Sequence, residues 1–102
     1  MTTITVALDS PYVGDYHFPL VDGPHPDNSV HMKAAIQKVS ELLSAEGNMV
    51  LVHCVSGISR SATVVIGYLM LKGLSLDEAM NMVKKARPVI NPEPDLLTLL
   101  TT

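Results

Sequence analysis

Hydrophobic runs and turn signals alternate at the start of the chain and predict two short strands. Residues 2–8 read TTITVAL, a run rich in β-branched side chains that is typical of a strand. The pairs Ser10-Pro11 and Gly14-Asp15 then mark a turn. Residues 16–21 predict a second strand. Pro19 within it favours an edge position or an early end, because proline has no N–H group to donate to a ladder.

A polar loop at residues 22–28 separates these strands from an amphipathic helix. Asn28 or Ser29 is expected to cap this helix, and Gly47-Asn48 to end it. Its apolar side chains recur at helical spacing, at Met32, Ala35, Ile36, Val39, Leu42 and Leu43. The all-apolar run at residues 49–52 then predicts a strand that is covered on both faces, as in a parallel sheet.

Three further helices are expected in the second half of the chain. Residues 61–72 are apolar on nearly every side, so this helix should be central and buried, with Gly73 just beyond its end. Ser75 and Glu78 form a capping-box pattern that opens the next helix, which Pro88 stops. A short last helix should start at Asn91-Pro92. The order of elements predicts a single α/β domain over residues 1–102, with a small, mostly parallel central sheet flanked by helices.

Composition and charge exclude several classes of protein. Of the 102 residues, 47% are hydrophobic and 17% are charged, which rules out intrinsic disorder. No apolar run approaches the ~20 residues of a bilayer span, and residues 1–20 lack the pattern of a signal peptide. The net charge of −3 leaves one small basic cluster, at residues 84–87, and argues against nucleic-acid binding. Cys54 is the only cysteine, which fits a reducing cytoplasm.

The most informative residues lie where the third predicted strand passes into a helix. Cys54 stands at the end of the strand, Arg60 at the start of the helix, and Gly57 in the loop between them. Such a loop can turn several N–H groups inward as an anion nest, and the helix N-terminus adds positive potential. The planar guanidinium of Arg60 can hold two oxygens of a phosphate or sulfate. The same field should lower the pKa of the Cys54 thiol and yield a thiolate nucleophile. The alternative interpretation is that Cys54 is an ordinary core cysteine and Arg60 an ordinary surface arginine.

The segment from His53 to Ser61 resembles the His-Cys-x₅-Arg-Ser/Thr signature of the cysteine-dependent protein tyrosine phosphatases, specifically their dual-specificity branch. The resemblance continues through residues 59–63, 67–70 and 86–90. It implies a protein tyrosine phosphatase-like fold, without the usual elements that precede residue 16, and a phosphatase that needs no metal or cofactor.

The resemblance also implies a role for each residue of the signature. Cys54 attacks phosphorus and forms a phosphocysteine intermediate. Ser61 donates a hydrogen bond to the thiolate, with a helix-capping role as the alternative, and His53 orients the loop without acting as a general base. Phosphate oxygens are held by the Arg60 side chain and by the backbone N–H groups of Val55, Ser56, Gly57, Ile58 and Ser59.

The general acid of this family is an aspartate on a separate loop before the cysteine. Asp22 directly follows the second predicted strand and is favoured for this role. Asp27 is the alternative, although its place just before a helix also suits a capping or turn residue.

None of residues 55–59 is basic, and this absence bears on the substrate. We expect a phosphorylated protein, with phosphotyrosine and also phosphoserine or phosphothreonine, rather than an inositol lipid or an RNA triphosphate. Phosphate and vanadate-like anions should occupy the site. The alternative is a catalytically weak phosphate-binding or scaffold module, because Glu93 stands where the family has a loop-supporting asparagine. We also expect an uncovered sheet edge and, through it, a homodimer.

Overall fold

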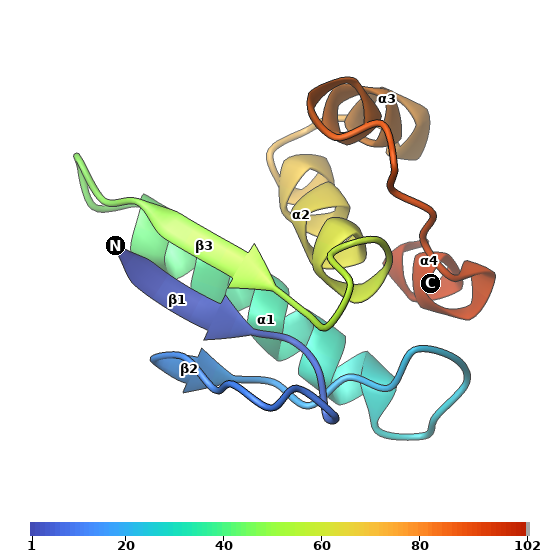
Figure 1. The fold of residues 1–102 in the computed structure, drawn as a ribbon. Coiled ribbons are helices and arrows are strands. Elements are labelled where there is room, and N and C mark those ends of the chain that lie inside the picture. Colours follow the sequence, from blue (N-terminus) through green and yellow to red (C-terminus); the bar gives the residue numbers. More distant parts are fainter. Residues whose placement is uncertain (102) are drawn as a thin grey trace.

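A parallel sheet of three strands organises the computed structural model, which describes residues 1–101. β1 (Thr2–Thr5) lies between β2 (Tyr16–His17) and β3 (Val50–His53). Ile4 is in register with Tyr16 of β2 and with Val52 of β3. The helices are α1 (Asn28–Leu43), α2 (Arg60–Leu71), α3 (Leu76–Ala86) and α4 (Pro94–Leu100). Figure 1 shows α1 running along one face of the sheet, with α2 packed beside it and α3 and α4 farther out. This layered α/β arrangement confirms the predicted fold class.

Both N-terminal strands are shorter than the sequence predicts. β1 ends at Thr5 rather than at Leu8, and β2 ends at His17 rather than at Val21. Beyond these points the chain stays linked by single hydrogen bonds: Phe18 N–H donates to the Thr5 carbonyl at 2.8 Å, and Leu8 N–H to the Leu20 carbonyl at 2.9 Å. Pro19 cannot donate to a ladder, so β2 ends early at the edge of the sheet, as predicted.

β3 departs from its prediction as a strand covered on both faces. It is the other edge of the sheet, and its Leu51 is 47% exposed. Thr2 and Val6 N–H groups donate to the Met49 and His53 carbonyls at 2.9 Å. Since bonding residues alternate along a parallel strand, the backbone groups of Val50 and Val52 face the open edge. An all-apolar run predicts a strand, but it does not reveal whether other elements cover both faces of that strand.

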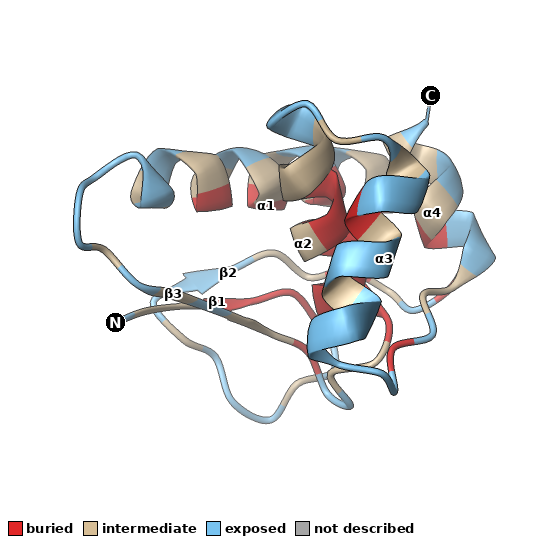
Figure 2. Cartoon of the chain, turned by 90° about the horizontal axis from the view of Figure 1, so that it is seen from above, coloured by how far each residue is buried: buried red, intermediate tan, exposed pale blue. Residues whose placement is uncertain are grey.

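The core lies between the sheet and the helices, with α2 at its centre. α2 packs against α1, α3, α4 and β3, which confirms the central position predicted for this helix. In Figure 2 the buried residues face inward from α1 and α2, while α3 shows a mostly exposed outer surface. The fully buried large side chains come from every layer: Ile4, Leu20, Met32, Ile66 and Leu96, with Val6, Val64, Thr5 and Thr63. The opposite face of the sheet carries the segment of residues 9–15, where Gly14 packs directly against the Thr3 side chain.

Two helix starts agree with the sequence-based predictions, and two differ. Ser75 and Glu78 make the predicted capping box, with bonds of 3.2 Å from Glu78 N–H to Ser75 Oγ and 3.0 Å in return. The N-cap of α1 is Asp27, so the expectation of Asn28 or Ser29 was wrong. α2 starts at Arg60, the residue that the sequence places at the start of this helix, whereas α4 starts at Pro94 instead of at the expected Asn91-Pro92. No helix within residues 1–101 is long and apolar enough to cross a membrane.

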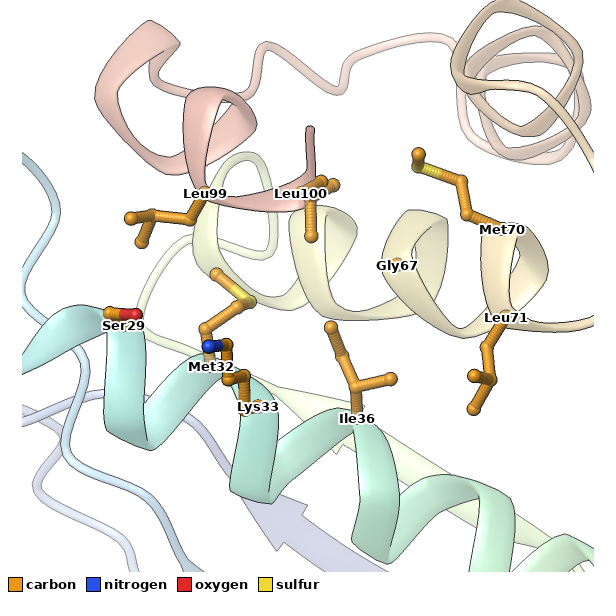
Figure 3. Close-up of a pocket in the computed structure, with 9 residues that line it drawn as sticks. All are labelled: Ser29, Met32, Lys33, Ile36, Gly67, Met70, Leu71, Leu99 and Leu100. Carbon is orange, nitrogen blue, oxygen red and sulfur yellow. The ribbon is translucent and has the colours of Figure 1, made fainter. Parts of the chain in front are cut away.

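An apolar cavity of about 350 Å³ lies between α1, α2 and α4. Figure 3 shows Met32 and Ile36 of α1 facing Gly67 of α2 and Leu100 of α4 across it. Gly67 permits this approach, because a Cβ there would overlap the Ile36 Cδ1 atom and come within 2.9 Å of Leu100 Cδ2. The cavity is remote from Cys54 and belongs to the packing of the helices.

Replacing Gly67 by valine should therefore destabilise the protein. The branched side chain has to displace Ile36 and Leu100, and overpacking of this kind costs about 1–3 kcal/mol. Urea denaturation should show the loss as a lower midpoint, with Gly67→Ala less affected because the crowded atoms are the ends of flexible side chains. Equal midpoints for Gly67→Val and the native chain would contradict this packing.

Candidate active site

The thiol of Cys54 lies at the base of the loop that joins β3 to α2. Its sulfur is 3.3 Å from the Ser61 Oγ atom and accepts a 3.3 Å hydrogen bond from the Gly57 N–H group. Gly57 has a φ of 72°, a left-handed conformation that glycine adopts without strain. This turn directs the Gly57 N–H group toward the sulfur. Cys54 itself is only 8% exposed. The thiol is thus held by donors on both the loop and the first turn of α2.

Burial and hydrogen bonding act on the Cys54 thiol in opposite directions. Burial by itself raises the pKa of this thiol, because a charge loses hydration inside the protein. The hydrogen bonds of Ser61 and Gly57, together with the positive charge of Arg60, outweigh burial and hold the pKa below its usual value. The site therefore favours a thiolate, the nucleophilic form of cysteine.

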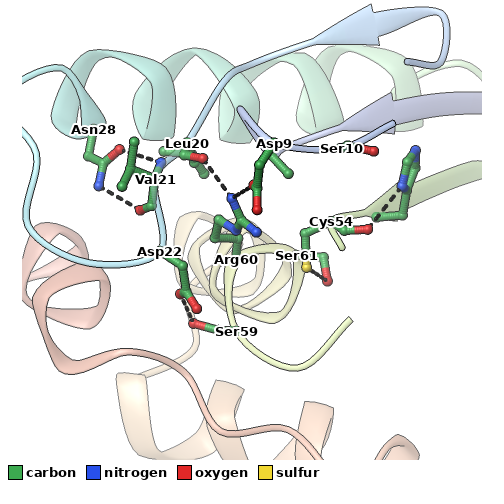
Figure 4. A network of polar contacts seen from close by, with 12 residues as sticks. Asp9, Ser10, Leu20, Val21, Asp22, Asn28, Cys54, Ser59, Arg60 and Ser61 are labelled. Carbon is green, nitrogen blue, oxygen red and sulfur yellow. Dashed lines mark hydrogen bonds and ion pairs between the residues drawn. The ribbon is translucent and has the colours of Figure 1, made fainter. Parts of the chain in front are cut away.

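Arg60 is buried at the first position of α2 and points back toward the N-terminal half of the chain. Figure 4 shows its guanidinium between Asp9 and the Leu20 carbonyl. The Nη1 atom donates to Asp9 Oδ1 at 2.5 Å and to the Leu20 oxygen at 3.0 Å. The hydrogen bond from Arg60 holds the pKa of the Asp9 carboxyl below its usual range. Asp9 was not among the residues that the sequence singled out.

Asp22 lies against the same loop, from the segment that follows β2. The Ser59 hydroxyl donates to Asp22 Oδ1 at 2.7 Å, and Asp22, Asp9 and Arg60 line one cavity of about 280 Å³. Asp27, the alternative acid, is the exposed N-cap of α1 and has no contact with residues 54–60 in the described part of the chain. The fold therefore brings Asp22, and not Asp27, to the loop of Cys54.

The buried side chain of Asn28 holds the Asp22 segment in place. Its Oδ1 accepts from Val21 N–H at 2.9 Å, and its Nδ2 donates to the carbonyls of Val21 and Gly23 at 2.9 and 2.8 Å. Asn28 thus satisfies backbone groups on both sides of Asp22, and Figure 4 shows the Val21 contacts. The sequence signal was an asparagine before a helix, which normally indicates a cap.

The tail after α3 braces the loop from outside. Arg87 Nε donates to the Gly57 carbonyl at 3.1 Å, and Asn91 N–H donates to the Ile58 carbonyl at 2.9 Å. Glu93 N–H donates to Ser59 Oγ at 2.9 Å. The tail therefore binds outward-facing atoms of the loop, and the backbone of Glu93 makes the contact rather than its carboxylate.

His53 faces the sheet rather than the mouth of the site. Its Nε2 lies 2.7 Å from Thr5 Oγ1, and its Nδ1 lies 3.3 Å from the Cys54 carbonyl oxygen, which can only accept. Thr5 Oγ1 already accepts from Gly14 N–H at 2.8 Å, so its own proton is available to Nε2. The Cys54 carbonyl requires a proton on Nδ1 for this contact to be a hydrogen bond. His53 thus links the loop to β1 and is not placed to take a proton from a substrate.

Comparisons with known proteins show which family this chain resembles in sequence and in structure. Residues 7–102 match the family described as dual specificity phosphatase, catalytic domain. The dual specificity protein phosphatase Mpk3 of Drosophila melanogaster is 44% identical over 75 residues, which are 72% of this chain and 18% of that protein. The crystal structure of human DUSP28 has a TM-score of 0.82 and 34% identity, covering 97% of this chain and 73% of that chain. A mouse dual specificity phosphatase crystallised with zinc tungstate also has a TM-score of 0.82, at 33% identity, with coverages of 97% and 65%.

The loop around Cys54, the layered sheet and the family match agree with one another. The chain belongs to the dual specificity phosphatase family, within the protein tyrosine phosphatase-like fold. The resemblance that the signature residues suggested is thereby confirmed.

The environment of the thiol makes a prediction for Ser61. Replacing Ser61 by alanine removes a hydrogen bond to the sulfur, so the pKa of Cys54 should rise. The rate of alkylation by iodoacetamide as a function of pH reports this pKa, and its midpoint should move to higher pH. Ser10→Ala is the matched control, because the Ser10 hydroxyl bonds to the Tyr12 carbonyl and not to the sulfur. An unmoved midpoint in Ser61→Ala would contradict the assignment.

Proposed function

We propose that this chain is a phosphomonoester hydrolase that removes phosphate from phosphotyrosine, and also from phosphoserine and phosphothreonine, through a phosphocysteine intermediate. The observation that carries this proposal is the sulfur of Cys54, which is held by Gly57 of the loop and Ser61 of α2, with Arg60 at the first position of that helix. A stabilised thiolate beside a guanidinium suits attack on a bound phosphate dianion.

In the first step Cys54 acts as the nucleophile. The N–H groups of residues 55–60 and the Arg60 side chain hold the phosphate oxygens while the sulfur attacks phosphorus. The bond between phosphorus and the leaving oxygen breaks, and protonated Asp22 gives its proton to that oxygen. The products of this step are the dephosphorylated group and a phosphate bonded to Cys54.

In the second step water releases the phosphate. The Asp22 carboxylate takes a proton from the water, whose oxygen attacks phosphorus as the bond to sulfur breaks. The Ser61 hydroxyl, 3.3 Å from the sulfur, stabilises the thiolate as it leaves. Asp22 recovers its proton, and the enzyme returns to its starting state. The contact between Asp22 and Ser59 supports the placement of the acid beside the loop.

The charges around the loop favour a substrate with one phosphate. Residues 55–59 carry no basic side chain, and both Asp9 and Asp22 line the adjoining cavity. A polyphosphate would place further negative charge beside these carboxylates. A phosphorylated protein presents a single dianion, and the tungstate of the mouse relative is a tetrahedral oxyanion of similar shape.

A phosphate-binding scaffold without turnover remains the second candidate function. Glu93 motivated it, because a carboxylate pointing at the loop would repel a dianion. Within residues 1–101 the Glu93 carboxylate has no hydrogen bond or ion pair with the loop, and its backbone N–H supports Ser59 instead. This geometry favours the catalytic proposal. We further propose a cytoplasmic location, where a reducing environment keeps the lone Cys54 as a thiol.

Hydrolysis of p-nitrophenyl phosphate between pH 4.5 and 8 tests the mechanism. Cys54→Ser should abolish turnover, and Asp22→Asn should lower kcat by about 10²-fold or more, since an acid group is lost. Asp27→Asn is the matched control and should keep the native profile. Vanadate binding without turnover by the native chain would favour the scaffold instead.

We also propose that two copies pair through the open edge of β3. The backbone groups of Val50 and Val52 face this edge, and the side chains of Met49 and Leu51 are 63% and 47% exposed beside it. A second β3 running antiparallel would satisfy the backbone groups and cover the apolar side chains. The strand has no inward-pointing charge that would oppose such pairing.

Light scattering at micromolar concentration tests this assembly. The native chain should be a dimer, and Leu51→Lys should be a monomer, because a charge at an edge strand disfavours pairing. Val30→Lys is the matched control, since Val30 is an exposed apolar residue on α1, away from the edge. A native monomer, or a dimer that survives in Leu51→Lys, would overturn the proposal.

A further inference from the structure

The Arg60 guanidinium is held at one end by groups of the protein itself. Both hydrogen bonds of this side chain start from the same nitrogen, Nη1, which donates to Asp9 Oδ1 at 2.5 Å and to the Leu20 carbonyl at 3.0 Å. A guanidinium Nη atom carries two N–H groups, so these contacts use the full capacity of Nη1. The Arg60 side chain is only 8% exposed, whereas Asp9 is 65% exposed.

The opposite edge of the guanidinium is free. Nε and Nη2 have no hydrogen-bond partner within residues 1–101. No buried side-chain nitrogen or oxygen in this part of the chain lacks a partner, so these two atoms must reach solvent. Together they form the planar fork that binds two oxygens of a phosphate. Figure 4 shows Cys54 on the other side of Arg60 from Asp22, with Asp9 above them.

Asp9 stands on a segment that is fixed to the sheet. The N–H group of Gly14 in this segment donates to Thr5 Oγ1 of β1 at 2.8 Å. Leu8 N–H bonds to the Leu20 carbonyl at 2.9 Å, so the residue before Asp9 and the second acceptor of Arg60 are tied together. Asp9 and Leu20 therefore present a rigid pair of acceptors to Nη1.

We infer that Asp9 is a positioning residue, which holds Nη1 of Arg60 so that the fork of Nε and Nη2 is ready for the phosphate. This inference deepens the proposed function and rests on it. A long arginine side chain otherwise has to lose its rotamer freedom when the substrate binds. With Nη1 already fixed, that ordering is complete before the phosphate arrives, and the transition state receives two preorganised donors.

Asp9 could instead mimic the phosphate by binding Arg60 in its place. The substrate would then have to displace the Asp9 carboxylate. The contact geometry favours positioning, because Asp9 occupies the end of the guanidinium and leaves its fork vacant. A stand-in anion would be expected to bind the fork itself. The two roles predict opposite effects when the carboxylate is removed, so one experiment separates them.

The experiment compares Asp9→Ala, Asp9→Asn and Asp15→Asn with the native chain. Turnover of p-nitrophenyl phosphate and the dissociation constant of orthovanadate are measured for each, with thermal unfolding as a check on folding. Asp9→Ala should lower kcat on the order of tenfold and weaken vanadate binding by a similar factor, because a misplaced group loses much of its effect. Asp9→Asn keeps an oxygen acceptor for Nη1 and should recover part of both losses. Asp15→Asn removes the same charge from the same segment, keeps a side-chain oxygen that can accept from Thr3 N–H, and does not touch Arg60, so it should match the native chain.

The outcomes separate this inference from the proposed function. The positioning role is overturned if Asp9→Ala binds vanadate more tightly than the native chain, or if both Asp9 variants keep the native kcat and vanadate affinity. In either case, turnover by the native chain still supports the proposed function. Equal losses in Asp9→Asn and Asp15→Asn also overturn it, because the effect would then come from charge alone. If the native chain binds vanadate without turnover, weaker binding in Asp9→Ala still supports positioning, although the proposed function fails. A native chain that neither binds vanadate nor turns over overturns both.

Discussion

The site depends on the shape of the loop that joins β3 to α2. Residues 54–59 belong to neither element, so apart from the Ser59 carbonyl, which accepts from Thr63 N–H at 2.9 Å, their polar atoms need partners outside the ladder and the helix. The tail after α3 solves this problem by binding the Gly57 and Ile58 carbonyls and the Ser59 hydroxyl from outside. These contacts hold the loop from outside in the turn that directs the Gly57 N–H group toward the Cys54 sulfur. Everything else at the site, including the reactivity of Cys54, requires that this loop keep its shape.

Three groups that surround this loop come from distant parts of the chain. Asp9 follows β1, Asp22 follows β2, and Glu93 precedes α4. The carboxyl ends of parallel strands meet at one edge of the sheet, which brings the first two residues next to the start of α2. The Ser59 hydroxyl then joins the Asp22 segment to the tail, because it donates to Asp22 and accepts from Glu93 N–H. The sheet thus brings Asp9 and Asp22 close to the loop, and short hydrogen bonds then fix how these side chains are oriented.

Local patterns were sufficient to predict the helices and the reactive loop. The capping box at Ser75 involves residues that are neighbours in sequence, and the loop from Cys54 to Arg60 carries its chemistry within one short segment. The contacts of Asp9 with Arg60 and of Asn28 with Val21 depend on the path of the chain in space, and no periodicity reports them. Asn28 shows this limit well: its position before a helix suggested a cap, but its side chain turns back to hold the Asp22 segment. The apolar run of β3 similarly indicated a strand without revealing that one edge is open.

The external bracing of the loop has a consequence for how the protein is made. A ribosome releases Cys54 well before the tail from Arg87 to Glu93, because synthesis runs from the N-terminus to the C-terminus. A nascent chain can form the sheet and the first turns of α2 while its loop carbonyls still lack their partners. The loop therefore gains these outer contacts only after the tail has been synthesised and has docked. The order of translation thus separates the synthesis of the Cys54 segment from the completion of the support around its loop.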